Sequence, residues 1–133
     1  VVLSAIFYFY ARRGVVQDQF VHRYDTFHYF MAPRYYNELN YQDLYVCALQ
    51  ALKKRDIPLS TPVRDLRTYR MTTAGELRKP KLCPRDNFSK ERWSRFKKDL
   101  SVYTQTPGGY NLIQRAIADR GYNGTPIHAS ISG

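Results

Sequence analysis

Prolines recur along this chain and limit the length of any regular element. The sequence has 133 residues and seven prolines. A proline lacks a backbone donor and disfavours the helical conformation of the residue before it. Ala32-Pro33, Ile57-Pro58 and the two prolines of residues 79–84 therefore divide the chain into short segments, and Pro107-Gly108-Gly109 adds a further break. We expect several short elements joined at prolines.

The segments between these breaks carry apolar residues at helical spacing. Phe20, Tyr24, Phe27 and Met31 follow one another at three- and four-residue steps, which indicates a helix that ends at Ala32-Pro33. The predicted helices cover residues 17–31, 42–55, 62–77, a fourth stretch that contains 93–103, and 110–120. Thr61 is expected to cap the third helix, Asp86 or Ser89 the fourth, and Gly121 to stop the last.

The predicted fold is all-α, with several short helices, Pro-marked joints and irregular N- and C-terminal segments. Tyr35-Tyr36-Asn37 is expected in a loop, and no segment alternates as a strand. We divide the chain into an N-terminal aromatic anchor with the first helix at 1–30, a helical domain at 31–121 and an irregular tail at 122–133. Val1 to Tyr10 is almost entirely apolar, but ten helical residues extend only about 15 Å, half of a bilayer core.

The charge favours an anionic partner. Lys and Arg total 21 against 11 acidic residues, for a formal net charge of +10. Such a charge opposes compaction and attracts nucleic acid, anionic lipid or an acidic protein face. The 12 tyrosines point to protein contacts, because Tyr and Arg are enriched at interfaces.

The two cysteines, Cys47 and Cys83, are not part of a CxxC motif. Their spacing therefore excludes a zinc site built on paired cysteines and leaves a single disulfide open. The composition is not that of a secreted disulfide scaffold, so we expect two reduced thiols.

The chain shows no pattern of an enzyme active site. It has no GxSxG nucleophile turn and no glycine-rich phosphate loop of the GxGxxG or GxxxxGK[ST] type. His22 and His28 are six residues apart, which places them on different sides of one helix. We therefore expect no catalytic residues, no metal site and no cofactor.

The basic residues concentrate in two places. Arg64, Arg67 and Arg70 are three residues apart, so on a helix they spread over a broad strip of about two turns. Residues 78–98 hold nine basic and two acidic residues, a net +7. A solvated face and a contact with phosphate or acidic protein both fit this cluster.

The order of features between Phe30 and Arg120 resembles the subunit 7 family of mitochondrial ubiquinol–cytochrome c reductase, respiratory complex III, also known as its ubiquinone-binding protein. The matching features are Tyr35-Tyr36-Asn37, Ala51-Leu52-Lys53-Lys54 with Pro58, Arg64/Arg67/Arg70, Leu82-Cys83-Pro84, Trp93 with Asp99, and Tyr103, Pro107 and Tyr110 before residues 113–120. The chain is similar to that family as a divergent member.

This resemblance implies a small structural subunit without an active site, peripheral on the matrix side of the mitochondrial inner membrane. Its implied partners are cytochrome b and the core subunits, with anionic lipid such as cardiolipin as a further contact and no nucleic acid. The candidate contact residues are Arg64, Arg67, Arg70, Arg85, Trp93, Lys97, Lys98, Tyr103 and Tyr110. Trp93 also fits the core of the domain itself.

Two other functions remain open at the level of sequence. A basic RNA-binding protein, such as a mitochondrial ribosomal protein, would use the same charge and aromatic rings. An accessory subunit of a different inner-membrane assembly would look similar. Salt dependence separates the first from a subunit, since RNA binding weakens steeply with salt.

Overall fold

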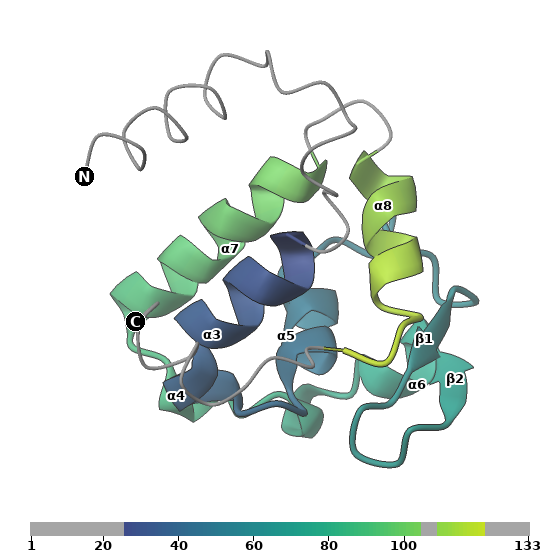
Figure 1. The fold of residues 1–133 in the computed structure, drawn as a ribbon, viewed down its shortest axis with the longest axis horizontal. Helices are drawn as coiled ribbons and strands as arrows, with labels where there is room; N and C mark the ends of the chain where they lie inside the picture. Colours follow the sequence, from purple (N-terminus) through teal and green to yellow (C-terminus); the bar gives the residue numbers. More distant parts are fainter. Residues whose placement is uncertain (1–25, 105–108, 122–133) are drawn as a thin grey trace.

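The described part of the chain is mainly helical and contains one small β-hairpin (Figure 1). A computed structural model describes residues 26–104 and 109–121. The prediction of short helices is confirmed in this part, whereas a strictly all-α fold is wrong because residues 62–73 form two strands. The predicted N-terminal anchor and C-terminal tail lie outside the described residues, apart from residues 26–30.

The first described elements form one nearly continuous helical segment. The π-helix η1 (Phe27–Met31) leads directly into α3 (Ala32–Arg34), and Met31 and Ala32 both have helical backbone angles. The predicted stop at Ala32-Pro33 is therefore wrong, because proline is tolerated in the first turn of a helix. The expected loop at Tyr35-Tyr36-Asn37 is also wrong: α4 (Tyr36–Leu39) begins there, and Tyr35 is fully buried.

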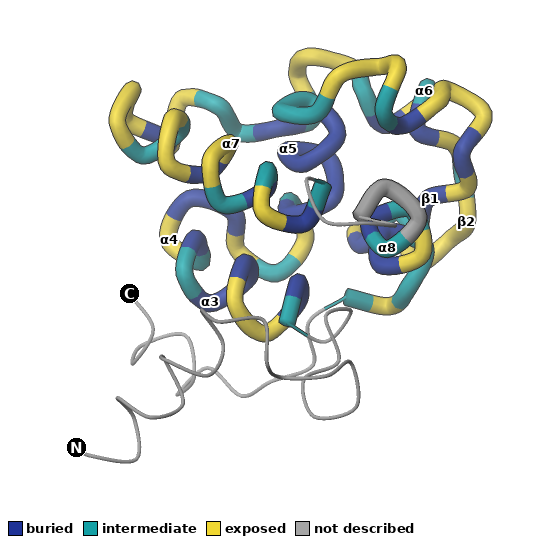
Figure 2. The backbone as a smooth tube through the Cα atoms, turned by 90° about the horizontal axis from the view of Figure 1, so that it is seen from above, coloured by how far each residue is buried: buried dark blue, intermediate teal, exposed yellow. Residues whose placement is uncertain are grey.

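Helix α5 (Leu44–Ala51) forms the centre of the domain. Its residues Leu44 to Leu49 are all buried, which Figure 2 shows as an unbroken dark segment surrounded by the other elements. The helix is shorter than predicted, because Leu52 is already extended. The basic residues 53–55 consequently lie in the turn that follows and not in the last helical turn.

The predicted helix over residues 62–77 is replaced by a hairpin and a short helix. Strands β1 (Pro62–Arg64) and β2 (Met71–Thr73) are antiparallel, with Val63 opposite Thr72. Helix α6 (Ala74–Leu77) follows at once, with the Thr73 hydroxyl accepting a hydrogen bond from the Glu76 amide. Thr61 therefore caps no helix here.

Two short 3₁₀ turns, η2 (Pro80–Leu82) and η3 (Arg85–Asn87), connect α6 to α7 (Lys90–Thr104). The Ser89 hydroxyl accepts a hydrogen bond from the Arg92 amide, as an N-cap does, so Ser89 and not Asp86 caps this helix. Phe96, Leu100 and Tyr103 recur at helical spacing and form the buried face of α7.

The last helix, α8 (Gly109–Ala116), is shorter than predicted. Ile113 and Ile117 are buried. Gly121 has a φ of +88°, and a Cβ there would lie 3.0 Å from a Leu66 methyl group. Glycine is therefore required at this position, although the helix itself has ended before it.

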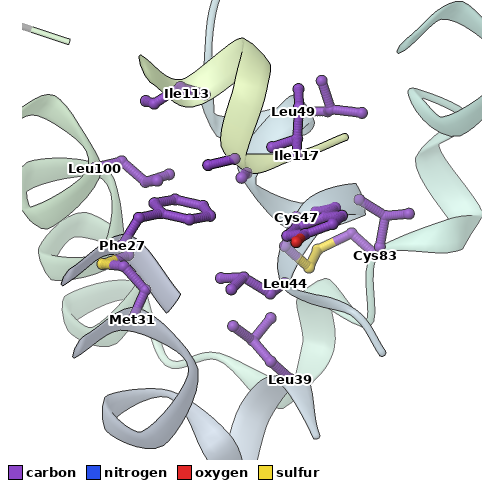
Figure 3. Packing of buried hydrophobic residues seen from close by; sticks show 14 of the residues in the cluster. Phe27, Met31, Leu39, Leu44, Cys47, Leu49, Cys83, Leu100, Ile113 and Ile117 are labelled. Atoms are coloured by element: carbon purple, nitrogen blue, oxygen red, sulfur yellow. A yellow bond between two sulfur atoms is a disulfide. The ribbon is translucent and has the colours of Figure 1, made fainter. Parts of the chain in front are cut away.

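One hydrophobic core joins all these elements. Figure 3 shows Phe27 and Met31 of η1 near Leu100 of α7, with Ile113 of α8 and Ile117, the residue after that helix, in the same cluster. His28 is buried among them, and its Nε2 lies 2.7 Å from the Tyr45 hydroxyl and 3.2 Å from the Ala116 carbonyl.

The expectation of two reduced thiols is wrong, because Cys47 of α5 and Cys83 form a disulfide (Figure 3). Cys47 is fully buried and Cys83 almost so. The bond ties the central helix to the segment that follows η2. Sequence spacing could not predict it, since the turns between the two residues determine whether they meet.

Among the described residues, no helix combines the length and apolar character that crossing a bilayer requires.

Candidate interaction surfaces

Most arginines of the domain serve its own structure. Seven of them donate hydrogen bonds to carbonyl or carboxylate groups within the described residues: Arg34, Arg55, Arg64, Arg67, Arg78, Arg85 and Arg92. Arginine suits this role because its planar group reaches several acceptors at once. A large part of the net positive charge is therefore used inside the domain.

Arg78 is the most highly bonded of these arginines. Its guanidinium donates to the carbonyls of Leu49, Leu52, Lys53 and Ile57 at distances of 2.5–3.3 Å. These carbonyls lie in the last turn of α5 and in the turn beyond it, where a helix leaves acceptors without intrahelical partners. Burial lowers the pKa of Arg78. This side chain closes the end of the central helix.

A second group of charges joins α7 to α3 and α4. Arg92 Nε donates to Glu38 at 2.5 Å, and Arg92 also lies over the Tyr35 ring. About two turns further along α7, Asp99 accepts hydrogen bonds from Arg34 and from the Tyr35 hydroxyl. The Glu38 partner raises the pKa of Arg92. The charged residues Arg92 and Asp99 are thus paired with opposite charges where α7 faces α3 and α4.

The three arginines predicted to form a helical strip lie instead on the hairpin. Arg64 is in β1, and its Nη1 donates to the Tyr69 carbonyl at 2.8 Å. Arg67 forms an ion pair with Asp43 and donates to the Leu82 carbonyl. Arg70 is exposed, and its side chain makes no hydrogen bond or ion pair to a described residue. Only the last of the three is free for a partner.

The loop between β1 and β2 holds Tyr69 in an unusual conformation. The Asp65 carboxylate accepts the Arg67 amide, and the Tyr69 amide donates to the Asp65 carbonyl at 2.7 Å. This closure gives Tyr69 a φ of +57°, the left-handed region that glycine or asparagine normally occupies in hairpin loops. The Tyr69 ring is nevertheless 62% exposed.

Two further apolar residues are exposed on the hairpin and its flank. Met71, the residue opposite Arg64 across the strands, is 47% exposed. Leu59, which lies beside Gly75 at the other end of the hairpin, is 48% exposed. We call Leu59, Tyr69, Arg70 and Met71 the hairpin surface.

The outward side of α7 carries the free cations of that helix. Lys90, Arg95, Lys97 and Lys98 are all exposed, and none pairs with a described carboxylate. At about 100° per residue they fall within roughly 160° of the helix circumference. A shallow depression lies at Ser94, lined also by Lys90, Glu91, Arg95 and Lys98. We call the four cations the α7 face.

The remaining predicted contact residues belong to the interior or its edge. Trp93 stacks on Phe96, and the Arg85 guanidinium lies over the Trp93 ring, 4.4 Å from its centre. Tyr103 is buried against Phe27, and its hydroxyl donates to the Thr26 carbonyl. Tyr110 is in α8, and its side chain lies outside the described part. Lys97 and Lys98 are the predicted residues that the structure brings together on an open surface.

Sequence reasoning missed the hairpin surface and the Arg78 clamp. The Thr73-Ala74-Gly75-Glu76 pattern matches a capping box and was a signal that a helix begins at Ala74. Nothing local marks Arg78, because its acceptors are 21 to 29 residues away.

The described residues contain no group of three His, Cys, Asp or Glu side chains that could hold a metal ion. No family model, curated protein or solved structure matches this chain. Its function is therefore inferred from its residues and their geometry.

Proposed function

We propose that this chain is a non-catalytic accessory subunit that docks onto a protein partner through the hairpin surface. The observation that carries the proposal is Tyr69, whose exposed ring is held at a left-handed backbone position. Such a conformation costs about 1–2 kcal/mol for a residue with a Cβ. Backbone strain of this kind concentrates at functional sites.

The fold itself does not need the Tyr69 ring. The two hydrogen bonds that fix the loop at this residue use its backbone amide and carbonyl, which donate to and accept from Asp65 and Arg64. Glycine would make both bonds without strain. A tyrosine in this place is therefore best explained by what its ring contacts outside the described residues.

The other members of the hairpin surface fit a protein interface. Tyr, Met and Arg are enriched at the centres of such interfaces, where aromatic anchors carry much of the binding energy. Met71 and Leu59 supply apolar area, and Arg70 supplies a guanidinium that has no partner among the described residues. The partner surface is expected to combine an apolar pocket with a carboxylate at its rim.

The resemblance to the subunit 7 family supplies the finer proposal, that the partner is respiratory complex III. In this proposal the chain lies on the matrix side of the inner membrane against cytochrome b and the core subunits. The order of motifs from Tyr35 to Tyr110 supports it. The Cys47–Cys83 disulfide argues against the matrix location, because disulfides are rare in reducing compartments.

The experiment compares two variants that relieve the same kind of strain. Tyr69→Gly removes the ring from the hairpin surface. Asn40→Gly, after α4, changes the other non-glycine residue of positive φ in the described part of the chain. The free energy of unfolding of both variants should lie within about 1 kcal/mol of that of the unmodified chain. On native gels, the unmodified chain and Asn40→Gly should co-migrate with cytochrome b, and Tyr69→Gly should not.

The outcomes separate the two levels of the proposal. Loss of a large complex in Tyr69→Gly alone supports hairpin docking, and the identity of that complex decides between complex III and another inner-membrane assembly. Equal incorporation of Tyr69→Gly and the unmodified chain refutes docking through the hairpin.

RNA binding is a second candidate function, and it would use the cations of the α7 face. Four cations on one helix, none of them paired with a described carboxylate, suit a phosphate backbone. Sedimentation of the chain with ribosomes, abolished by nuclease, is the result that this candidate predicts.

A further inference from the structure

The α7 face differs from the rest of the basic residues in chemistry and in position. Three of its four cations are lysines, whereas the cations bonded inside the domain are mostly arginines. Lysine carries a strongly hydrated point charge that favours diffuse attraction, and arginine favours fixed, forked hydrogen bonds. The α7 face is therefore suited to an extended anionic surface and less to one carboxylate.

The helix presents this charge along an open edge of the domain. Helix α7 has 15 residues, so it is about 22 Å long. Figures 1 and 2 both place it at the end of the domain opposite β1 and β2. A partner on the α7 face and a protein on the hairpin surface would not compete for space.

A shallow depression lies at the centre of the α7 face, at Ser94. The small Ser94 side chain lines the depression that Lys90, Arg95 and Lys98 surround, so a phosphate group can approach three cations together. One carboxylate, Glu91, opposes this attraction. Its pKa is lowered by a hydrogen bond from its own amide and by one from Ser89, so it stays ionised at the helix start. Cations still outnumber it four to one.

The α7 face offers no exposed aromatic ring for bases to stack on. Of the described aromatic residues, those with largely exposed rings are Tyr29, Phe30 and Tyr69, and none of them is in α7. Proteins that bind single-stranded nucleic acid combine charge with aromatic stacking platforms. A surface of lysines without rings fits the phosphate layer of a membrane better.

We propose that the α7 face binds the phosphate groups of an anionic phospholipid surface. Each basic residue close to such a surface contributes attraction worth about a fivefold change in affinity. This contact goes beyond the proposed subunit function, since it uses a different end of the domain and none of the hairpin residues.

The test is vesicle co-sedimentation of the full chain, with two matched double variants. Lys97→Gln/Lys98→Gln removes two charges from the α7 face. Lys53→Gln/Lys54→Gln removes two exposed charges from the turn after α5. The vesicles are phosphatidylcholine alone or an equal mixture of phosphatidylcholine and cardiolipin, at low and at high salt.

The unmodified chain should bind the mixed vesicles at low salt and lose them at high salt, because ions screen exposed charges. Little of the chain should bind to vesicles of phosphatidylcholine alone. Lys97→Gln/Lys98→Gln should weaken binding about 25-fold, whereas Lys53→Gln/Lys54→Gln should weaken it much less. An equal loss of vesicle binding in both double variants would show that binding depends on net charge alone, and it would overturn the assignment to the α7 face.

Competition decides the class of polyanion. An RNA duplex added in phosphate equivalents equal to the lipid should leave most of the chain on the vesicles. Transfer of the chain to RNA, again through Lys97 and Lys98, overturns the membrane proposal in favour of RNA. Neither result depends on Tyr69, so failure here is distinct from failure of hairpin docking.

Discussion

The Tyr35 hydroxyl donates a 2.6 Å hydrogen bond to Oδ2 of Asp99, 64 residues further along the chain. The same oxygen accepts from Arg34 Nε at 3.0 Å. Because Tyr35 is fully buried and packs edge-on against Phe96, this carboxylate fixes α7 against the junction of α3 and α4.

Asp99→Ala should lower the free energy of unfolding by about 2–3 kcal/mol. The substitution leaves a buried hydroxyl and a partly buried guanidinium without their acceptor. Asp86→Ala is the matched control, because Asp86 is exposed and makes no hydrogen bond or ion pair to a described residue; its change should stay within about 0.5 kcal/mol. Urea denaturation measures both values. Equal stability of the two variants would contradict a structural role for Asp99.

Alkaline pH should destabilise the domain through its buried tyrosines. Burial raises the pKa of Tyr103 and of Tyr35 above the ordinary value of 10.0, and Asp99 adds to both shifts. The stability from these neutral hydroxyls is fully present below pH 10, the unfolded pKa, and is lost as pH rises toward the folded values. The thermal unfolding midpoint should therefore stay constant up to about pH 10 and decrease as the pH rises above that value.

Tyr103→Phe isolates one of these two groups. This variant keeps the ring in the core and removes the ionisable hydroxyl, which donates to the Thr26 carbonyl. We expect a small loss of stability at neutral pH and a weaker fall at alkaline pH than in the unmodified chain. Parallel pH curves for the two proteins would argue that other groups cause the alkaline loss.

Removing the disulfide should destabilise the domain by about 3–4 kcal/mol, because the bond closes a long loop in the unfolded chain. Cys47 and Cys83 are 36 residues apart. Thermal unfolding of Cys47→Ala/Cys83→Ala measures the effect, and a reductant should lower the midpoint of the unmodified chain only. Alkylation followed by mass measurement should find no free thiol at these positions in chain isolated without reductant; two free thiols would contradict the bond.

Arg78→Ala should be far more destabilising than Arg70→Ala. The first change leaves four carbonyls around the end of α5 without their shared donor, and we expect a loss of about 3 kcal/mol. Arg70 is exposed, so its loss should stay within about 0.5 kcal/mol. Arg78→Lys should restore only part of the stability, because one ammonium cannot reach all four acceptors. Guanidinium denaturation compares the three variants.

Helix α7 could be predicted because its signals are local. Ser89 stands at the cap, and Phe96, Leu100 and Tyr103 recur at the spacing of one helix face. A search for Ser/Thr-x-x-Glu would also have placed the start of α6 at Thr73. The lysines of the α7 face follow from the same pattern, since they occupy the positions that the core does not.

The hairpin was not predictable in the same way. Val63, Leu66 and Tyr69 are three residues apart and fit a helix equally well. The strand is favoured over the helix because β1 forms hydrogen bonds along its outer edge. The Arg64 amide donates to the Ile117 carbonyl, and Arg64 Nε donates to the Ala118 carbonyl. These acceptors come from the chain after α8, more than 50 residues away.

The sequence by itself determined the short elements, the apolar faces and the excess of positive charge, because spacing, caps and prolines act within a few residues. Only the tertiary structure decided which cations are free, which cysteines pair and where Tyr69 points. Each of these depends on groups far apart in sequence, such as Cys47 and Cys83 or Arg78 and Leu49. Their meeting is set by packing around α5, which no local pattern encodes.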